Sequence, residues 1–152
     1  MKRVTWAIVA GIAFWSGTAL YAADNDKTGN LYQRLGGMPA IQAVVDDLVT
    51  RILADERVNR YFAHAGADPE NARAYKAKLA DFICQATGGP CKYAGADMVT
   101  AHAGRGITED AFNAVVSDLV ATLDKLQVPE KEKNQLLGLL GPMKAAIVQS
   151  KQ

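Results

Sequence analysis

The chain has 152 residues, of which 49% are hydrophobic, 22% charged and 7% aromatic, and its formal net charge is +1 at pH 7. This length fits one domain, and this hydrophobic content supports a buried core, which excludes an intrinsically disordered protein. The near-zero net charge, with acidic and basic residues interspersed, excludes a nucleic-acid-binding protein that works through a basic stripe.

The N-terminus is predicted to be a secretory signal peptide. Residues 2–3 are basic, residues 4–21 carry no charge, and the small residues Ala22 and Ala23 follow. This order is typical of an export signal cleaved after Ala22 or Ala23, so residues 1–23 are predicted to be removed and the mature domain to be periplasmic. An uncleaved membrane anchor is the alternative, because the uncharged run is nearly long enough to span a bilayer.

The first part of the mature chain is predicted to be helical. Residues 24–30 are polar and predicted to be loose, and Asn30 suits the N-cap of a helix over 31–35 that the glycine pair 36–37 ends. Pro39 suits the first turn of the next helix. The apolar residues of that helix recur at helical spacing, at Ile41, Val44, Val45, Leu48 and Ile52. Residues 63–67 are small and predicted to be a loop.

Three further helices carry clear start signals. Asp68, Pro69 and Glu70 predict a helix that reaches Ala86, because a capping aspartate, an early proline and an acidic first turn favour helix initiation. Thr108 is predicted to cap the next helix. The last helix is predicted to begin at residues 128–129 and to kink at residues 141–142. No strand alternation occurs, so the fold class is all-α, with one domain over residues 31–150.

The stretch from Cys84 to Ile107 contains both cysteines, one of the two histidines and several glycines. It is predicted to turn the chain around a ligand and to present His102, which precedes Gly104 and Gly106. A neutral imidazole is the commonest protein ligand of a transition metal, and haem iron accepts one. The other histidine, His64, follows small residues and is predicted to be solvated.

The two cysteines are predicted to form a disulfide. Cys84 lies near the end of a helix and Cys91 follows a Gly-Gly-Pro break, so the chain can fold back on itself. In an oxidising compartment such a bond would stabilise the turn by about 2–3 kcal/mol. Two free thiols, or a metal site shared with His102, are the alternatives. The arrangement Cys-x-x-Cys-His is absent, so covalent c-type haem is not expected.

From Leu31 to about Val148 the chain resembles the group 1 truncated haemoglobins of the globin superfamily. The resemblance covers nearly the whole mature chain, and its ordered glycine motifs with a histidine before Gly-x-Gly-Ile are specific. The matching pieces are Leu31-Tyr32, Gly36-Gly37, Ile41, Val44-Val45, Ile52-Leu53-Ala54-Asp55, Tyr61-Phe62, Gly88-Gly89-Pro90, Tyr93, Met98 and the run from His102 to Thr108.

The resemblance implies a two-over-two helical sandwich around a non-covalent b-type haem, with His102 as the proximal iron ligand. It also implies apolar and aromatic pocket walls, and cations near the haem propionates. The residues implied to line the pocket are Val49, Phe62, Tyr75, Leu79, Phe82, Tyr93, Met98 and Ile107. The candidate cations are Arg73, Lys76 and Arg105.

Two positions depart from the family pattern. Val49 stands where the family usually has a tyrosine that hydrogen-bonds the gaseous ligand, and Leu79 stands where many relatives have a glutamine. The usual hydrogen-bond donors are therefore missing, and Tyr75, one turn before Leu79, is the expected substitute. The chain also has extra length between Phe62 and the helix that carries these residues.

The resemblance implies reversible binding, and in that sense transport, of oxygen or nitric oxide, and leaves open whether nitric oxide dioxygenase activity accompanies it. The alternative depends on Lys78, which stands where some relatives have a histidine or lysine that ligates the iron when no gas is present. In that case the protein would be a six-coordinate His/Lys haem protein for periplasmic electron transfer or redox sensing, with an unidentified electron donor. Otherwise Lys78 reaches a propionate or solvent.

Overall fold

The computed structural model describes residues 29–149. The predicted signal peptide, residues 1–23, lies outside the described residues, as do residues 24–28 of the segment predicted to be loose. None of the helices described between residues 29 and 149 has the length and apolar character needed to cross a membrane.

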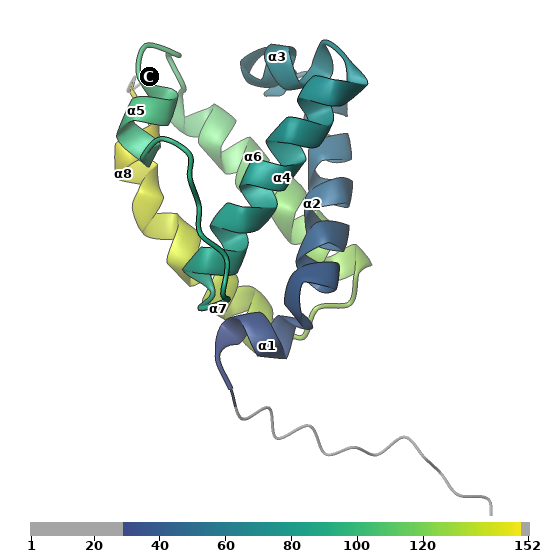
Figure 1. The fold of residues 1–152 in the computed structure, drawn as a ribbon. Helices are drawn as coiled ribbons and strands as arrows, with labels where there is room; N and C mark the ends of the chain where they lie inside the picture. Colours follow the sequence, from purple (N-terminus) through teal and green to yellow (C-terminus); the bar gives the residue numbers. More distant parts are fainter. Residues whose placement is uncertain (1–28, 150–152) are drawn as a thin grey trace, which may run out of the picture.

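The described residues form an all-helical domain, as predicted, and no strand occurs among them (Figure 1). In chain order the elements are α1 (Leu31–Leu35), α2 (Gly37–Ala54), the 3-10 helix η1 (Asn59–Phe62), α3 (Ala63–Gly66), α4 (Pro69–Ala86), α5 (Met98–His102), α6 (Glu109–Lys125), α7 (Glu130–Leu140), the 3-10 helix η2 (Gly141–Met143) and α8 (Lys144–Ile147).

The predicted helix starts are confirmed by their capping bonds. Asn30 caps α1, and the side chain of Gln33 returns a bond to the Asn30 backbone, which forms a capping box. The Asp68 carboxylate accepts from the second and third amides of α4, at 2.9 and 2.8 Å. The Thr108 hydroxyl accepts from the amide of Ala111 at 3.1 Å and so caps α6.

The prediction of a loop over residues 63–67 was wrong, because residues 63–66 form the helical turn α3. Two of these residues are alanine, the best helix former, and Ala65 is buried against the neighbouring elements. Packing therefore stabilises a turn too short to be stable alone. The predicted kink at residues 141–142 is confirmed, since the chain tightens into η2 between α7 and α8.

The core lies where α2 packs against α4 on one side and α6 on another (Figure 1). Its fully buried hydrophobic side chains come from α2, α4, α6, α7 and the segment before η1: Ile41, Val45, Val49, Ile52, Val58, Cys84, Leu123 and Leu136. On the other side of α4, α5 lies beside α8 (Figure 1). The loop of residues 87–97 joins the end of α4 to the start of α5 (Figure 1).

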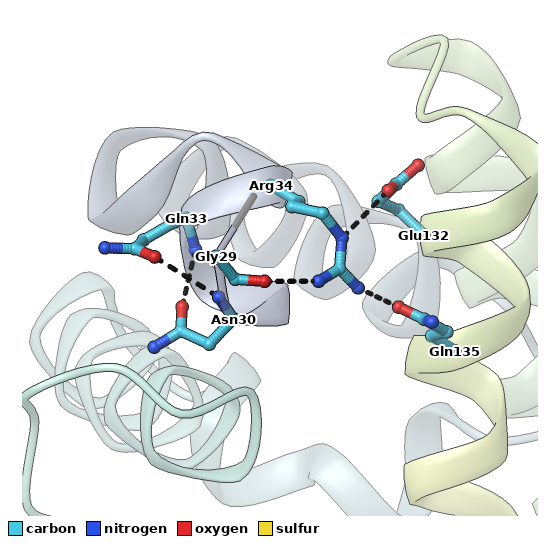
Figure 2. A network of polar contacts seen from close by, with 6 residues as sticks. All are labelled: Gly29, Asn30, Gln33, Arg34, Glu132 and Gln135. Atoms are coloured by element: carbon cyan, nitrogen blue, oxygen red, sulfur yellow. Dashed lines mark hydrogen bonds and ion pairs between the residues drawn. The ribbon is translucent and has the colours of Figure 1, made fainter. Parts of the chain in front are cut away.

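Arg34 links α1 to α7 through hydrogen bonds (Figure 2). Its guanidinium donates to Glu132 of α7 at 3.1 Å, to the carbonyl of Gly29 at 2.6 Å, and to the side chain of Gln135. Glu132 is only 4% exposed, so its carboxylate needs this partner. Because Asn30 also donates to the carbonyl of Gly88 at 2.6 Å, residues 29 and 30 are fixed in place.

A second polar cluster joins α2 to α6. The carboxylate of Asp47 accepts from Lys125, from Arg51 at 2.7 Å and from Thr122 at 2.9 Å. The hydrogen bond from Lys125, followed by that from Arg51, holds the pKa of Asp47 well below its ordinary value. Since Asp47 is mostly covered, these bonds should contribute to stability whenever the carboxylate is charged.

Replacing Asp47 by asparagine is expected to destabilise the protein by about 1.5–3 kcal/mol at pH 7, the range for hydrogen bonds to charged groups. The pKa of Asp47 is lowered on folding, so its contribution is complete above the unfolded value of about 4 and is lost as the pH falls below it. Urea denaturation at pH 7 and pH 3 measures this. The cost of the substitution should shrink at pH 3.

The matched control is Asp46→Asn. Asp46 pairs with Lys76 at 2.9 Å, but its side chain is 64% exposed. A solvated pair of this kind contributes about 0.5 kcal/mol. Equal losses for Asp46→Asn and Asp47→Asn, or a loss for Asp47→Asn that does not depend on pH, would contradict the proposed role of the Asp47 cluster.

Candidate functional site

His102 ends α5 with its imidazole half-buried and its tautomer fixed. Its Nδ1 lies 2.7 Å from the carbonyl oxygen of Met98, one turn earlier. A carbonyl oxygen can only accept, so Nδ1 carries a proton, and in the neutral imidazole Nε2 then has the lone pair. This is the state in which imidazole ligates a metal, and a hydrogen bond at the opposite nitrogen is what orients such a ligand.

The chain reverses directly after His102. The amide of Arg105 donates to the carbonyl of His102 at 3.3 Å, and Gly104 and Gly106 have φ of +70° and +62°. A Cβ at either glycine would meet no other atom within 4 Å. The left-handed backbone, and not a lack of space, is therefore what requires glycine in this turn.

An aromatic wall is built from α4, η1 and the chain before α5. Phe62 meets Tyr75 edge to face, with ring centroids 5.8 Å apart, and Phe82 meets Tyr93 in the same way at 5.2 Å. Tyr75 and Phe82 lie two turns apart on α4, so they share one face of the helix. All four rings are only half-buried, so they retain apolar surface to contact a further group.

The hydroxyl of Tyr75, one of the four residues of this wall, forms no hydrogen bond with the described residues. Burial raises the pKa of Tyr75 to about 12, while the Arg105 guanidinium acts in the opposite direction and Tyr93 adds a smaller increase. Among residues 29–149, none forms a hydrogen bond with the Tyr75 hydroxyl, which therefore remains available to donate to a ligand.

Other residues expected to line the pocket differ in burial. Val49 is completely buried in the core of α2, and Ile107 is also buried. Leu79 is half-buried and packs against the core. Met98 is half-buried, and its carbonyl oxygen accepts the hydrogen bond from Nδ1 of His102. Direct contact of these four residues with haem stays a prediction.

The three residues proposed to contact the haem propionates, Arg73, Lys76 and Arg105, differ in their partners. Lys76 points to α2, where it pairs with Asp46. Arg105 donates to the carbonyl of Tyr61 at 3.4 Å, and Arg73 is exposed. Lys78 is exposed on α4 and forms no ion pair with any residue between 29 and 149. His64 is exposed on α3, as predicted.

The predicted disulfide is confirmed, since Cys84 and Cys91 are joined. Gly89 lies inside the loop they close, where a Cβ would come 2.5 Å from the Cys84 sulfur and 2.6 Å from the ring of Tyr32. The chain has no other cysteine, so the alternatives with free thiols or a cysteine metal site are excluded. No cluster of three or more His, Cys, Asp or Glu able to bind a metal ion occurs in the described part of the chain.

A surface hollow of about 580 Å³ lies elsewhere, at the start of α6, and His102 does not line it. Its lining combines the polar and charged residues Arg57, Arg60, Thr108, Asp110, Asn113 and Ser117 with Ala111 and Ala114, and it contains no aromatic residue. Such a surface does not suit a flat apolar macrocycle. The candidate site is therefore defined by His102 and the aromatic wall.

One contributor was missed by sequence reasoning. Tyr61 was noted only as a matching residue, yet its hydroxyl donates to the carbonyl of Gly106 at 3.3 Å. The two residues are 45 positions apart, and no local pattern in the sequence indicates that they meet. The amide of Gly106 in turn donates to the side chain of Gln149 at 3.1 Å.

These residues fit a haem. The imidazole has a free Nε2, half-buried aromatic rings can cover a macrocycle, and the Tyr75 hydroxyl can serve a polar ligand. An all-helical domain with one oriented histidine and an aromatic wall defines the class of haem-binding globins.

Comparison with known proteins gives the family. A model described as bacterial-like globin matches residues 30–149, so the chain belongs to that family, and within it to the group 1 truncated haemoglobins. The group 1 truncated haemoglobin of Mycolicibacterium paratuberculosis is 35% identical over 117 residues, which cover 77% of this chain and 82% of the relative.

Solved structures agree. The ferric truncated haemoglobin of Tetrahymena pyriformis superimposes with a TM-score of 0.71 at 28% identity, over 80% of this chain and all of that chain (100%). The 2/2 haemoglobin of a Synechococcus species, in the cyanomet state and with covalently attached haem, gives 0.71 at 30% identity, over 79% and 98%. The predicted two-over-two fold is confirmed.

Proposed function

We propose that this globin reversibly binds a diatomic gas, oxygen or nitric oxide, at a haem iron ligated by Nε2 of His102. The observation that carries the proposal is the hydrogen bond from Nδ1 of His102 to the carbonyl of Met98, which leaves Nε2 free and orients the ring. When bound, the haem supplies the iron at which a diatomic gas binds.

The polar contact to the gas is assigned to Tyr75. The family's usual donor positions hold Val49 and Leu79, which have no hydrogen-bonding group. Tyr75 lies one turn before Leu79 on α4 and has no competing hydrogen-bond partner among residues 29–149. Its phenol is neutral at pH 7 and can donate, because burial raises its pKa further above the ordinary value. Its contact with Phe62 fixes the ring and so limits where the hydroxyl can point.

Replacing Tyr75 by phenylalanine is therefore expected to speed oxygen dissociation by about 5- to 10-fold, the value of one hydrogen bond of about 1 kcal/mol. The ring and its contact with Phe62 remain, so the fold should not change. Stopped-flow measurement on the haem-loaded protein tests this. Carbon monoxide, a far less polar ligand, should dissociate at nearly the wild-type rate.

The matched control is Tyr93→Phe. The hydroxyl of Tyr93 already donates to the carbonyl of Ala96 at 3.0 Å, so it is not available to a ligand. If oxygen dissociates from Tyr75→Phe at the wild-type rate, or if Tyr93→Phe gives the same acceleration, Tyr75 is not the donor.

Lys78 favours a second candidate function, a six-coordinate His/Lys haem protein for electron transfer or redox sensing. It shares the face of α4 that carries Tyr75 and Phe82, and no carboxylate between residues 29 and 149 engages its amine. Lys76, Lys125, Lys133 and Lys144 form ion pairs, whereas Lys92 and Lys131 form none with the described residues and do not belong to α4. An uncommitted amine on this face is available to an iron.

Lys78→Ala tests the second candidate, with Lys76→Ala as the control. If Lys78 ligates the iron, the gas-free ferrous wild type will have a low-spin absorption spectrum that becomes high-spin in Lys78→Ala only. A high-spin wild-type spectrum that neither substitution changes would eliminate the candidate and leave simple gas binding. Nitric oxide dioxygenase turnover would further require an electron donor.

Export to the periplasm and non-covalent haem attachment are further parts of the proposal. The Cys84–Cys91 disulfide suits an oxidising compartment. It also uses both cysteines of the chain, which leaves no thiol for a thioether bond to haem. Extraction of the haem into acidic organic solvent would demonstrate non-covalent attachment.

A further inference from the structure

Tyr61 lies between the two parts of the candidate site. It belongs to η1, which is anchored by the completely buried Val58 and by two amides that donate to the carbonyl of Asp55 at 3.0 and 2.8 Å. The next residue, Phe62, places its ring against Tyr75 of α4. The main chain at Tyr61 is therefore held by the core and by the aromatic wall.

The side chain and carbonyl of Tyr61 face the turn after His102. The hydroxyl donates to the carbonyl of Gly106 at 3.3 Å, and the Tyr61 carbonyl accepts from Arg105 at 3.4 Å. Arg60 donates to the hydroxyl oxygen at 2.7 Å, with its guanidinium 4.7 Å from the centre of the ring. Because the oxygen accepts from Arg60, its proton is left to point at Gly106, which strengthens that bond.

The turn needs such support. Helix α5 has five residues, too few to be stable alone, so the position of His102 depends on the contacts of α5 and of the turn that follows. Glycines 104 and 106 make this turn flexible in the unfolded chain and costly to order. Gly106 is held on both sides, at its amide by Gln149 and at its carbonyl by Tyr61.

We infer that Tyr61 is a positioning residue that holds the His102 turn at a fixed distance from the aromatic wall through its hydroxyl. The inference rests on the proposed function, since it assigns Tyr61 a role through His102. The Tyr61 hydroxyl forms its hydrogen bonds with Arg60 and Gly106, and none with His102 or with the four aromatic residues of the wall. Tyr61 links the His102 turn to the wall through Gly106 on one side and Phe62 on the other.

The test is Tyr61→Phe, which keeps the ring and removes the hydroxyl. Tyr32→Phe is the matched control, because Tyr32 is also half-buried and its hydroxyl also makes a hydrogen bond, with the amide of Met38 at 3.0 Å. In Tyr61→Phe, haem loss to an excess of a haem-scavenging apoprotein should be about 3- to 10-fold faster, as for loss of one hydrogen bond. The iron–histidine stretching band of the ferrous protein should shift or broaden.

A third readout does not require haem. Amide hydrogen exchange over residues 103–107 of the haem-free protein should be about 3- to 10-fold faster in Tyr61→Phe, and unchanged in Tyr32→Phe. Wild-type values for all three measurements, or equal changes in Tyr32→Phe, would overturn the inference. If the wild type binds no haem, the proposed function fails, while hydrogen exchange of the haem-free protein still decides whether Tyr61 fixes the turn.

Discussion

Replacing His102 by glycine will speed haem loss by at least about 100-fold, and free imidazole will restore binding. Changes to groups that merely orient a metal ligand cost 10- to 100-fold, so loss of the ligand itself must cost more. Glycine leaves room for imidazole to ligate the iron in place of the side chain. Haem transfer to an apoprotein, measured with and without imidazole, gives both rates.

His64→Gly is the control for this substitution. His64 is exposed on α3, and its side chain has no hydrogen bond or ion pair with another residue among 29–149. It should keep wild-type haem binding, with no response to imidazole. A His102→Gly protein that retains haem at the wild-type rate, with the wild-type spectrum, would remove His102 from its assigned role.

Loss of the disulfide is expected to have the second largest effect. The bond closes a loop across seven positions, and opening such a loop should lower the free energy of unfolding by about 2–3 kcal/mol. The freed segment carries Tyr93, which packs on Phe82 and whose amide donates to Gln85 at 2.8 Å. Haem loss should therefore also accelerate, by several-fold.

Urea denaturation of wild type and of the double variant Cys84→Ala, Cys91→Ala measures this, with and without dithiothreitol. Cys84 is completely buried, so its replacement also removes packing. Reduced wild type supplies the comparison in which no side chain is lost. Dithiothreitol should destabilise wild type and leave the variant unchanged. Equal stability of oxidised and reduced wild type would contradict the role given to the disulfide.

The helix starts of this domain were predictable because their causes are local. Asn30, Asp68 and Thr108 each bond amides two or three residues ahead, within a window that the sequence displays directly. The disulfide was predictable for a similar reason, since only seven positions and a glycine-proline break separate its cysteines.

Contacts between distant segments were not predictable. Residues 63–66 are helical because Ala65 is covered by its neighbours, which the small residues alone do not reveal. Lys76 was a candidate for the haem propionates but pairs with Asp46, since a long flexible side chain can reach several partners. The Tyr61–Gly106 bond crosses 45 positions and depends on the complete fold.

The role of His102 was inferred partly from the sequence and partly from the structure. Its place before a glycine turn indicated a ligand, and the resemblance to truncated haemoglobins assigned that ligand to iron. The bond from its Nδ1 to Met98 then defined which nitrogen is available. The resemblance had already implied the four aromatic residues as pocket lining. Their pairing, Phe62 with Tyr75 and Phe82 with Tyr93, required the structure, because the rings come from η1, α4 and the chain before α5.

The most direct test of haem ligation by His102 is a haem titration of purified wild-type protein, followed by its Soret absorption in the ferric and ferrous states. A Soret band that saturates at one haem per chain, and that His102→Gly loses unless imidazole is added, is the expected result. A chain that gives no Soret band after haem is supplied, or a band that does not depend on His102, would contradict the account.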